Sequence, residues 1–179
     1  MIARHPAGAI SLKLDLGCGT SKQPGFLGVD SRRFPGVDVV ADLREPWPWE
    51  DGTVEEVHCS HFVEHLTGPE RIHFVNELYR VLRPNGSATL IVPNWASARA
   101  YGDLTHQWPP VSPFWFYYLG KAWREQNAPH NDFYTCNFEV EYGYSVHQQF
   151  RDADQKTRDF ACLFYVDGGQ DIMAKLRRL

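Results

Sequence analysis

The sequence predicts an α/β fold built on a mostly parallel sheet of seven strands. In the first half of the chain, short apolar segments alternate with crossover connections, and Ala88–Pro93 is an almost unbroken apolar run typical of a central parallel strand. Near the end, two longer segments separated by a short polar turn predict an antiparallel pair. A length of 179 residues, 43% of them hydrophobic, fits a single domain over residues 1–179.

The parallel strands are expected where apolar residues stand between turn signals. Five segments have this pattern: Ser11–Leu16, Phe26–Asp30, Val37–Leu43, Val54–Ser60 and Ser87–Asn94. A helix is predicted over Gly68–Leu82, because apolar residues recur there at steps of three and four and form one face. The sequence RPNG, Arg83–Gly86, ends this helix with a proline and a glycine.

The C-terminal part is expected to hold the two remaining strands. Phe138–Phe150 alternates apolar and polar residues and predicts the sixth strand, and Thr157–Val166 predicts the seventh. The short polar connection between them favours antiparallel pairing. Gly168 and Gly169 are then expected to lead into a short closing helix.

A glycine turn follows the first predicted strand, in the segment LDLGCGTSKQPGFLGVD, Leu14–Asp30. Gly17 and Gly19 allow a tight turn that brings the backbone close to a ligand. Acidic or apolar residues stand at the ends of the first three strands: Asp15, Asp30, Asp42 and Leu43. Parallel strands have their carboxyl ends at one edge of the sheet, where open α/β folds bind ligands, so these residues predict one site. A carboxylate there can accept both hydroxyls of a ribose, and Leu43 can pack against an adenine.

The order of these motifs resembles that of class I S-adenosylmethionine-dependent methyltransferases. The resemblance covers Leu12–Asn94 and is carried by the segments DLGCG, GVD, ADL, CSHFVEHL and LYRVLRPNGSATLIVPN. The sequence is most similar to small type 11-like methyltransferases, which are often found among sugar and glycan biosynthesis proteins. Their first helix is shortened, as it is in the segment PGFLGVD. The resemblance implies a Rossmann-like domain with S-adenosyl-L-methionine as cofactor. It also implies donor contacts from Asp15, Gly17, Gly19, Asp30, Asp42, Leu43, Ser60 and His61. The further glycine usual in the family is replaced by Thr20 and Ser21.

The shortness of the glycine loop distinguishes this site from a dinucleotide site. Only ten residues, Thr20–Val29, separate Gly19 from Asp30. A dinucleotide-binding unit places a full helix there, with its N-terminus aimed at the pyrophosphate. S-adenosylmethionine carries no phosphate, so a glycine turn and acidic residues can suffice.

The segment HFVEH, His61–His65, matches a zinc-peptidase pattern in which two histidines share a metal on one helix face. Here the segment follows the fourth strand of a nucleotide-type sheet, and no clear later helix supplies a third carboxylate ligand. We therefore expect no metal, and a structural or substrate-side role for His65.

Three residues beyond the strand ends are candidate general bases for an acceptor hydroxyl. They are His61 after the fourth strand, and Asp103 and His106 in the segment YGDLTHQW. The resembled group often carries a similar D-x-T-H stretch, and imidazole titrates near neutral pH, so His106 is the first candidate. The alternative is a histidine that is only hydrogen-bonded within an ordered loop.

The segment 95–144 is rich in aromatic residues and is expected to lie on the acceptor side. It holds 14 of the 25 Phe, Tyr and Trp residues. Phe114–Tyr118 fits a core helix, whereas Trp95, Tyr101 and Trp108 are flanked by polar residues and could form an acceptor platform. A second subunit in a homodimer could also complete the acceptor pocket.

The sequence thus predicts a methyltransferase that O-methylates a small polar metabolite or a glycan by in-line transfer. Two alternatives stay open: an enzyme that uses or cleaves S-adenosylmethionine by another route, and a non-catalytic module that binds the donor or a protein partner. Nucleic acid is disfavoured as the acceptor, since the net charge is −4 and neither (D/N/S)PPY after the fourth strand nor a Pro-Cys dipeptide is present.

Location is predicted from what the sequence lacks and from its cysteines. No apolar run approaches the ~20 residues that a membrane span needs. The four scattered cysteines contain no CxxC pair and are expected to be reduced thiols in a cytoplasmic protein.

Overall fold

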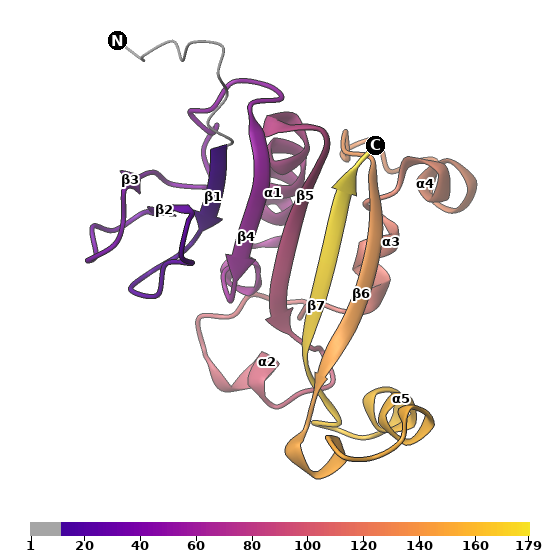
Figure 1. Ribbon diagram of the computed structural model, residues 1–179. Coiled ribbons are helices and arrows are strands. Elements are labelled where there is room, and N and C mark those ends of the chain that lie inside the picture. The colour runs from indigo at the N-terminus through magenta and orange to yellow at the C-terminus, as the bar shows by residue number, and fades with distance from the viewer. Residues whose placement is uncertain (1–11) are drawn as a thin grey trace.

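The computed structural model describes residues 12–179, which form a sheet of seven strands in the order β3-β2-β1-β4-β5-β7-β6 (Figure 1). The strands are β1 Leu12–Leu16, β2 Leu27–Asp30, β3 Val39–Val40, β4 Val54–Ser60, β5 Leu82–Pro93, β6 Phe138–Val146 and β7 Gly169–Arg178. The first five pair in parallel, and β7 lies antiparallel between β5 and β6. The predicted fold, a mostly parallel sheet with an antiparallel C-terminal pair, is confirmed.

Helices and 3-10 turns connect the strands. The α-helices are α1 Gly68–Val81, α2 Arg99–Gly102, α3 Pro113–Tyr117, α4 Lys121–Asn127 and α5 Gln155–Phe164, and the 3-10 turns are η1 Val63–His65 and η2 Gln148–Phe150. No helix within residues 12–179 is long and apolar enough to cross a membrane.

Helix α1 forms where the sequence supplies both a start signal and one apolar face. The Thr67 amide donates to Glu70 Oε2 at 2.7 Å, as part of a capping box that satisfies free donors of the first turn. Phe74, Val75 and Leu78 on one side of the helix are fully buried. They pack against the sheet, behind β4 and β5 in Figure 1. This contact fixes the residues that follow β4, which build the site described below.

The opposite face of the central strands is polar. Along β4, Val57 and Cys59 are buried while Glu56 and His58 are half-buried, so the strand alternates with a period of two. Lys13 on β1 pairs with Glu56 at 2.6 Å on this face. In Figure 1 the face of β4, β5 and β7 turned toward the viewer carries no helix from residues 12–179. The central strands are therefore covered by helix on one face only.

Two sequence-based expectations near the C-terminus are wrong. Residues 157–166, expected as the seventh strand, belong mostly to α5, whose N-cap Asp154 accepts the Thr157 amide at 2.9 Å. The segment after Gly168 and Gly169, expected as a helix, is the strand β7.

The physical reason lies in which side chains are buried. In β7, Ile172, Ala174 and Leu176 are fully buried and alternate with exposed residues, which is a strand period. In α5 the large apolar residues Phe160 and Leu163 are 51% and 65% exposed. The apolar segment that contains them therefore does not form a buried strand.

Other expected boundaries shift by a few residues. The third strand shortens to Val39–Val40, and the sixth ends at Val146 rather than at Phe150. The expected helix Phe114–Tyr118 is present as α3, Pro113–Tyr117, but it is not a core helix, because Phe116 alone is buried in it. The expected start of the first strand, Ser11, lies outside the described residues. All four cysteines are free and buried.

Replacing Gly168 by Ala should destabilise the fold, because a Cβ there would stand 2.0 Å from the carbonyl oxygen of Ala161 in α5. Backbone cannot yield as a flexible side chain does, so we expect the free energy of unfolding to fall by about 1–3 kcal/mol in urea denaturation. Gly143→Ala is the matched control, since a Cβ at Gly143 meets no atom within 4 Å. Equal stability of the two variants would mean that α5 does not pack at the start of β7.

Candidate functional site

The turn after β1 depends on glycine at two positions. Gly17 and Gly19 have φ angles of +67° and +52°, in the left-handed region that side chains disfavour. A Cβ on Gly17 would also stand 2.6 Å from the ring of Phe62. The amides of Gly17 and Cys18 both donate to the carbonyl of Val29, at 2.9 and 3.1 Å. These contacts hold the turn against the end of β2.

A cavity of about 380 Å³ lies beside this turn, at the carboxyl edge of the sheet. Three residues predicted to contact the donor, Asp30, Asp42 and Leu43, line it. The other lining residues are Ser31, Arg32, Ala41, Arg44, Phe62, His65, Leu66 and Thr105. The volume falls within the range of small-ligand pockets, about 300–1,000 Å³. We call this space the donor cavity.

The two acids of the donor cavity differ in their partners. Asp30 accepts the amides of Gly19 and Arg32, each at 3.0 Å, and each carboxylate oxygen keeps a further lone pair. Asp42 forms an ion pair with Arg44, whose Nη2 lies 2.7 Å from Oδ2. Hydrogen bonds from the Arg44 side chain lower the pKa of Asp42 to about 2, so this carboxylate stays charged in any physiological buffer.

Asp15 is placed differently from the other predicted donor contacts. Its side chain is only 2% exposed and both oxygens are engaged. Oδ1 lies 2.7 Å from His58 Nδ1, and Oδ2 accepts the amide of Gln23 at 2.7 Å. Asp15 therefore braces the loop Thr20–Val29 against β4, and its carboxylate does not line the donor cavity.

Ser60 ends β4, and His61 follows it directly before Phe62. His61 has a φ of +54°, which is uncommon for a residue other than glycine, and its amide donates to the Ile91 carbonyl at 2.8 Å. Its Nδ1 lies 3.2 Å from Glu64 Oε1, and this contact raises the pKa of His61. Only Val63–His65 of the HxxEH pattern forms a helical turn, η1, and His61 precedes it, so the two histidines do not share a helix face.

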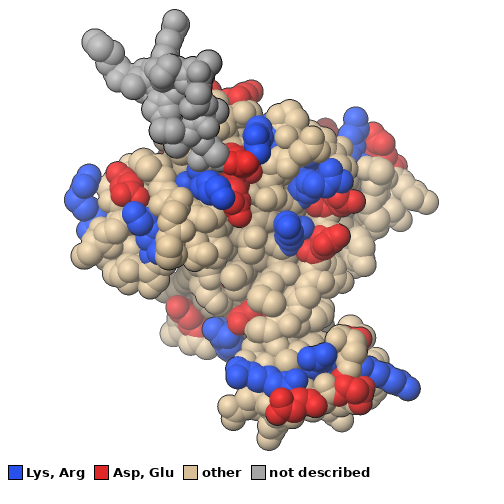
Figure 2. Space-filling model, viewed as in Figure 1, with Lys and Arg blue, Asp and Glu red and all other residues tan. Residues whose placement is uncertain are grey.

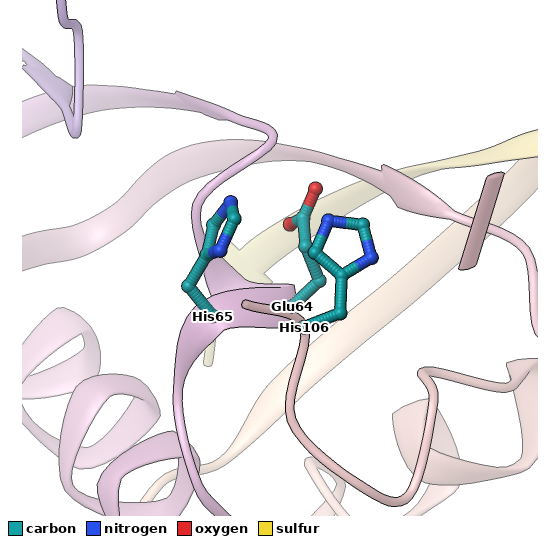
Figure 3. Close-up of side chains that lie close together, drawn as sticks. All are labelled: Glu64, His65 and His106. Atoms are coloured by element: carbon teal, nitrogen blue, oxygen red, sulfur yellow. The ribbon is translucent and has the colours of Figure 1, made fainter. Parts of the chain in front are cut away.

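Glu64, His65 and His106 come together where η1 meets the segment that follows β5. One potential ligand atom from each lies within 4.8 Å of the other two. Figure 3 shows the rings of His65 and His106 on either side of the Glu64 carboxylate. The ring centroids of the two histidines are 4.9 Å apart at 75°. Glu64 is 4% exposed, and its Oε2 is buried without a hydrogen-bond partner. We call this group the Glu64 cluster.

Arg71 on α1 brings the two segments of the cluster together. It is 6% exposed, and its guanidinium donates to four main-chain carbonyls. They belong to Val63, Glu64, Gln107 and Pro109, at 3.2, 3.4, 3.0 and 2.6 Å. The Gln107 amide also donates to the Glu64 carbonyl at 2.8 Å. His106 is thereby held beside His65.

Asp103 and His106, both predicted as bases, have different surroundings. Asp103 accepts the amide and the hydroxyl of Thr105, at 2.8 and 2.7 Å, and these bonds lower the pKa of its carboxyl. A carboxylate with a lowered pKa is a weaker base. His106 Nδ1 lies 3.2 Å from the carbonyl oxygen of Ala100, which can only accept, so Nδ1 carries the proton and Nε2 keeps its lone pair.

A second, mainly apolar cavity of about 290 Å³ lies between α2 and the end of α5. Two predicted acceptor residues, Trp95 and Tyr101, line it. The remaining lining residues are Ala96, Ser97, Ala98, Leu163, Phe164, Tyr165 and Val166. Trp108, the third predicted residue, is 79% exposed and lines neither cavity. We call this space the apolar cavity.

Several residues of the site were missed by the sequence analysis. Leu163–Val166 were assigned to a strand, so their position beside Trp95 could not be expected. Glu64 was read only as part of the HxxEH pattern, and His106 was not connected to it. The burial of Glu64 in a short turn after β4 gives no signal in the sequence.

Comparison with known proteins shows a partial match to one family. Residues 19–90 match the family described as a methyltransferase domain. An uncharacterized methyltransferase-like protein of Schizosaccharomyces pombe is 32% identical over 91 residues, which is 51% of this chain. The match covers 31% of that relative, so this chain spans about a third of its length.

Solved structures share the fold across nearly the whole chain. A SAM-dependent methyltransferase from Archaeoglobus fulgidus has a TM-score of 0.67 at 21% identity, covering 94% of this chain and 86% of that one. A methyltransferase in complex with the Haloferax volcanii Trm112 methyltransferase activator has a TM-score of 0.56 at 17% identity, covering 94% and 82%. The predicted class I methyltransferase fold is confirmed.

Arg71→Ala should both destabilise the protein and loosen the segment that carries His106. Removing the guanidinium leaves buried carbonyls without donors, so we expect the free energy of unfolding to fall by roughly 2–4 kcal/mol. Hydrogen exchange at the Gln107 amide should accelerate more than at amides of β4. Arg151→Ala, at an exposed arginine, is the control and should change neither quantity. Unchanged exchange at Gln107 in Arg71→Ala would contradict the role given to Arg71.

Proposed function

We propose that this chain is a class I S-adenosylmethionine-dependent methyltransferase that methylates a hydroxyl of a small polar metabolite or glycan. The observation that carries the proposal is the donor cavity. Asp30 from β2 and Asp42 and Leu43 from beyond β3 converge there, as the motif order leads one to expect.

The donor cavity supplies groups that suit each part of the donor. Asp30 can accept the two ribose hydroxyls with its free lone pairs, while the amides of Gly19 and Arg32 hold the carboxylate in place. Leu43 offers an apolar surface for the adenine. A side chain at Gly19 would enter open space, since no atom lies within 4 Å of its Cβ position. The turn at Gly19 thus leaves room for a ligand.

Methyl transfer asks the protein mainly to align two molecules. S-adenosylmethionine supplies, when bound, a methyl group on a sulfonium that leaves as the neutral thioether S-adenosylhomocysteine. The protein must hold the acceptor oxygen in line with the methyl, and such alignment is worth up to about 7–11 kcal/mol. It must also take the hydroxyl proton as the new oxygen–carbon bond forms.

The Glu64 cluster is suited to take that proton, because its residues contact segments that line both cavities. His65 and Thr105 line the donor cavity, while His106 contacts the carbonyl of Ala100 in α2. Tyr101 of α2 lines the apolar cavity. An acceptor with one apolar face could stack on Trp95 or Tyr101 and present a hydroxyl to the cluster. The flat faces of sugar rings fit this description.

The charge distribution does not favour nucleic acid as the acceptor. On the face drawn in Figure 2, Lys and Arg side chains lie among Asp and Glu side chains and do not merge into one basic patch. The net charge is −4, so the attraction that dominates binding to phosphate backbones is weak. The four free, buried thiols support a location in a reducing compartment such as the cytoplasm. A homodimer, which could add residues to the apolar cavity, belongs to the same proposal.

Asp30→Ala should weaken the binding of S-adenosylmethionine about 10- to 100-fold in isothermal titration calorimetry, because two charge-assisted hydrogen bonds to the ribose are lost. Asp152→Ala, at an exposed acid outside the cavity, should bind as the unmodified protein does. Thermal melts of the variants separate loss of the contact from loss of the fold. Unchanged affinity in a folded Asp30→Ala protein would mean that the donor binds elsewhere.

His106→Ala should slow methyl transfer about 10²- to 10⁴-fold while leaving donor affinity close to that of the unmodified protein. The assay measures S-adenosylhomocysteine formed with a panel of mono- and disaccharides and their methyl glycosides. His130→Ala, at an exposed histidine, is the control. Methylthioadenosine in place of S-adenosylhomocysteine would instead support an enzyme that cleaves the donor.

A further inference from the structure

We propose that Glu64, His65 and His106 form a binding site for one divalent transition-metal ion beside the donor cavity. This departs from the expectation, drawn from the HxxEH pattern, that the chain binds no metal. The site differs from that pattern because His106 replaces His61 as the second histidine, and it comes from the segment after β5. The potential ligand atoms of the three residues lie within 4.8 Å of one another.

The two histidines are held in the form that binds metals. The Thr105 hydroxyl donates its proton to Asp103 Oδ1 at 2.7 Å, so at its 2.9 Å contact with His65 Nδ1 it can only accept. His106 Nδ1 likewise faces the carbonyl of Ala100, at 3.2 Å. In the neutral form, both imidazoles therefore carry their proton on Nδ1 and have the Nε2 lone pair free. Metal-bound histidines are fixed by partners of this kind on the second nitrogen.

The carboxylate of Glu64 is the independent observation that indicates a cation. It is 4% exposed, and Oε1 lies 3.2 Å from His61 Nδ1, whereas Oε2 has no hydrogen-bond partner. A buried, unpaired carboxylate oxygen is costly, so native structures seldom leave one without a partner. Arg71 does not supply that partner, since it contacts the main-chain carbonyl of Glu64. A cation between the rings in Figure 3 would satisfy Oε2.

The ligand set defines the class of metal. Two imidazoles and one carboxylate suit Zn²⁺, Co²⁺ or Fe²⁺, whereas Mg²⁺ and Ca²⁺ prefer oxygen ligands. Three protein ligands leave a position open for water or for a hydroxyl. His65 also lines the donor cavity, so this open position would be close to the bound donor.

A role of the metal in catalysis rests on the proposed function. An acceptor hydroxyl bound to the metal loses its proton to solvent water at a lower pH than a free hydroxyl does, and its oxygen then attacks the methyl group. In that state His106 acts as a ligand, and the metal does what a general base would otherwise do. The binding of the metal itself does not require methyl transfer.

The test is a titration of chelator-stripped protein with Zn²⁺ by calorimetry, and with Co²⁺ by visible absorption. We expect one equivalent to bind with micromolar or tighter affinity, and Co²⁺ to give d–d bands of a four- or five-coordinate nitrogen and oxygen site. His106→Ala and the isosteric Glu64→Gln should each weaken binding by about 100-fold. Thr105→Val, which removes the hydroxyl that contacts His65 and donates to Asp103, should weaken it about 10-fold. His130→Ala should have no effect.

Two results would overturn the inference. One is the absence of stoichiometric Zn²⁺ and Co²⁺ binding to a folded protein, and the other is binding that survives both His106→Ala and Glu64→Gln. Donor binding, measured on the same samples, separates this outcome from failure of the proposed function. Donor binding without metal binding would leave the methyltransferase proposal intact and overturn the metal site. Metal binding without donor binding would support the metal site and contradict the methyltransferase proposal.

Discussion

The buried guanidinium of Arg71 is the contact on which the site depends most. It reaches from α1 to carbonyls of η1 and of the segment after β5, which are far apart in the chain. Only arginine offers five donors in a fixed planar fork, so lysine could not replace it. Burial lowers the pKa of Arg71, yet hydrogen bonds to carbonyls keep the charge compensated. Because α1 is fixed by its own apolar face, the position of His106 is set by the core of the protein.

The short loop after β1 shows how a nucleotide-type site can form with little helix. Three carboxylates hold the main chain of this segment in place by accepting hydrogen bonds from its amides. Asp15 accepts the Gln23 amide, Asp30 accepts the Gly19 amide, and Asp38 accepts the Gly28 amide. The pairing of Asp15 with His58 ties this loop to β4. One of these acids, Asp30, also faces the donor cavity, so loop geometry and ligand binding share a residue.

The sequence predicts the parts of the site that follow from the order of the strands. It does not predict those that depend on contacts between segments far apart in the chain. Asp30, Asp42 and Leu43 could be placed together because carboxyl ends of parallel strands always meet at one edge. The helix α5 and strand β7 were exchanged because an aromatic run suggested burial, whereas Phe160 and Leu163 are exposed. The Glu64 cluster could not be predicted, since its geometry depends on Arg71 contacts between distant segments. Asp15 matches the motif for a donor contact. The structure shows that its two carboxylate oxygens instead contact His58 and the Gln23 amide.

In the proposed complex the donor lies in the cavity beside Asp30, with its reactive end toward the Glu64 cluster. A crystal structure of the protein with S-adenosylhomocysteine tests this most directly. We expect the ribose hydroxyls on Asp30, the adenine against Leu43, and the sulfur directed toward His65 and His106. A nucleoside bound outside this cavity, or a sulfur directed away from the cluster, would contradict the account.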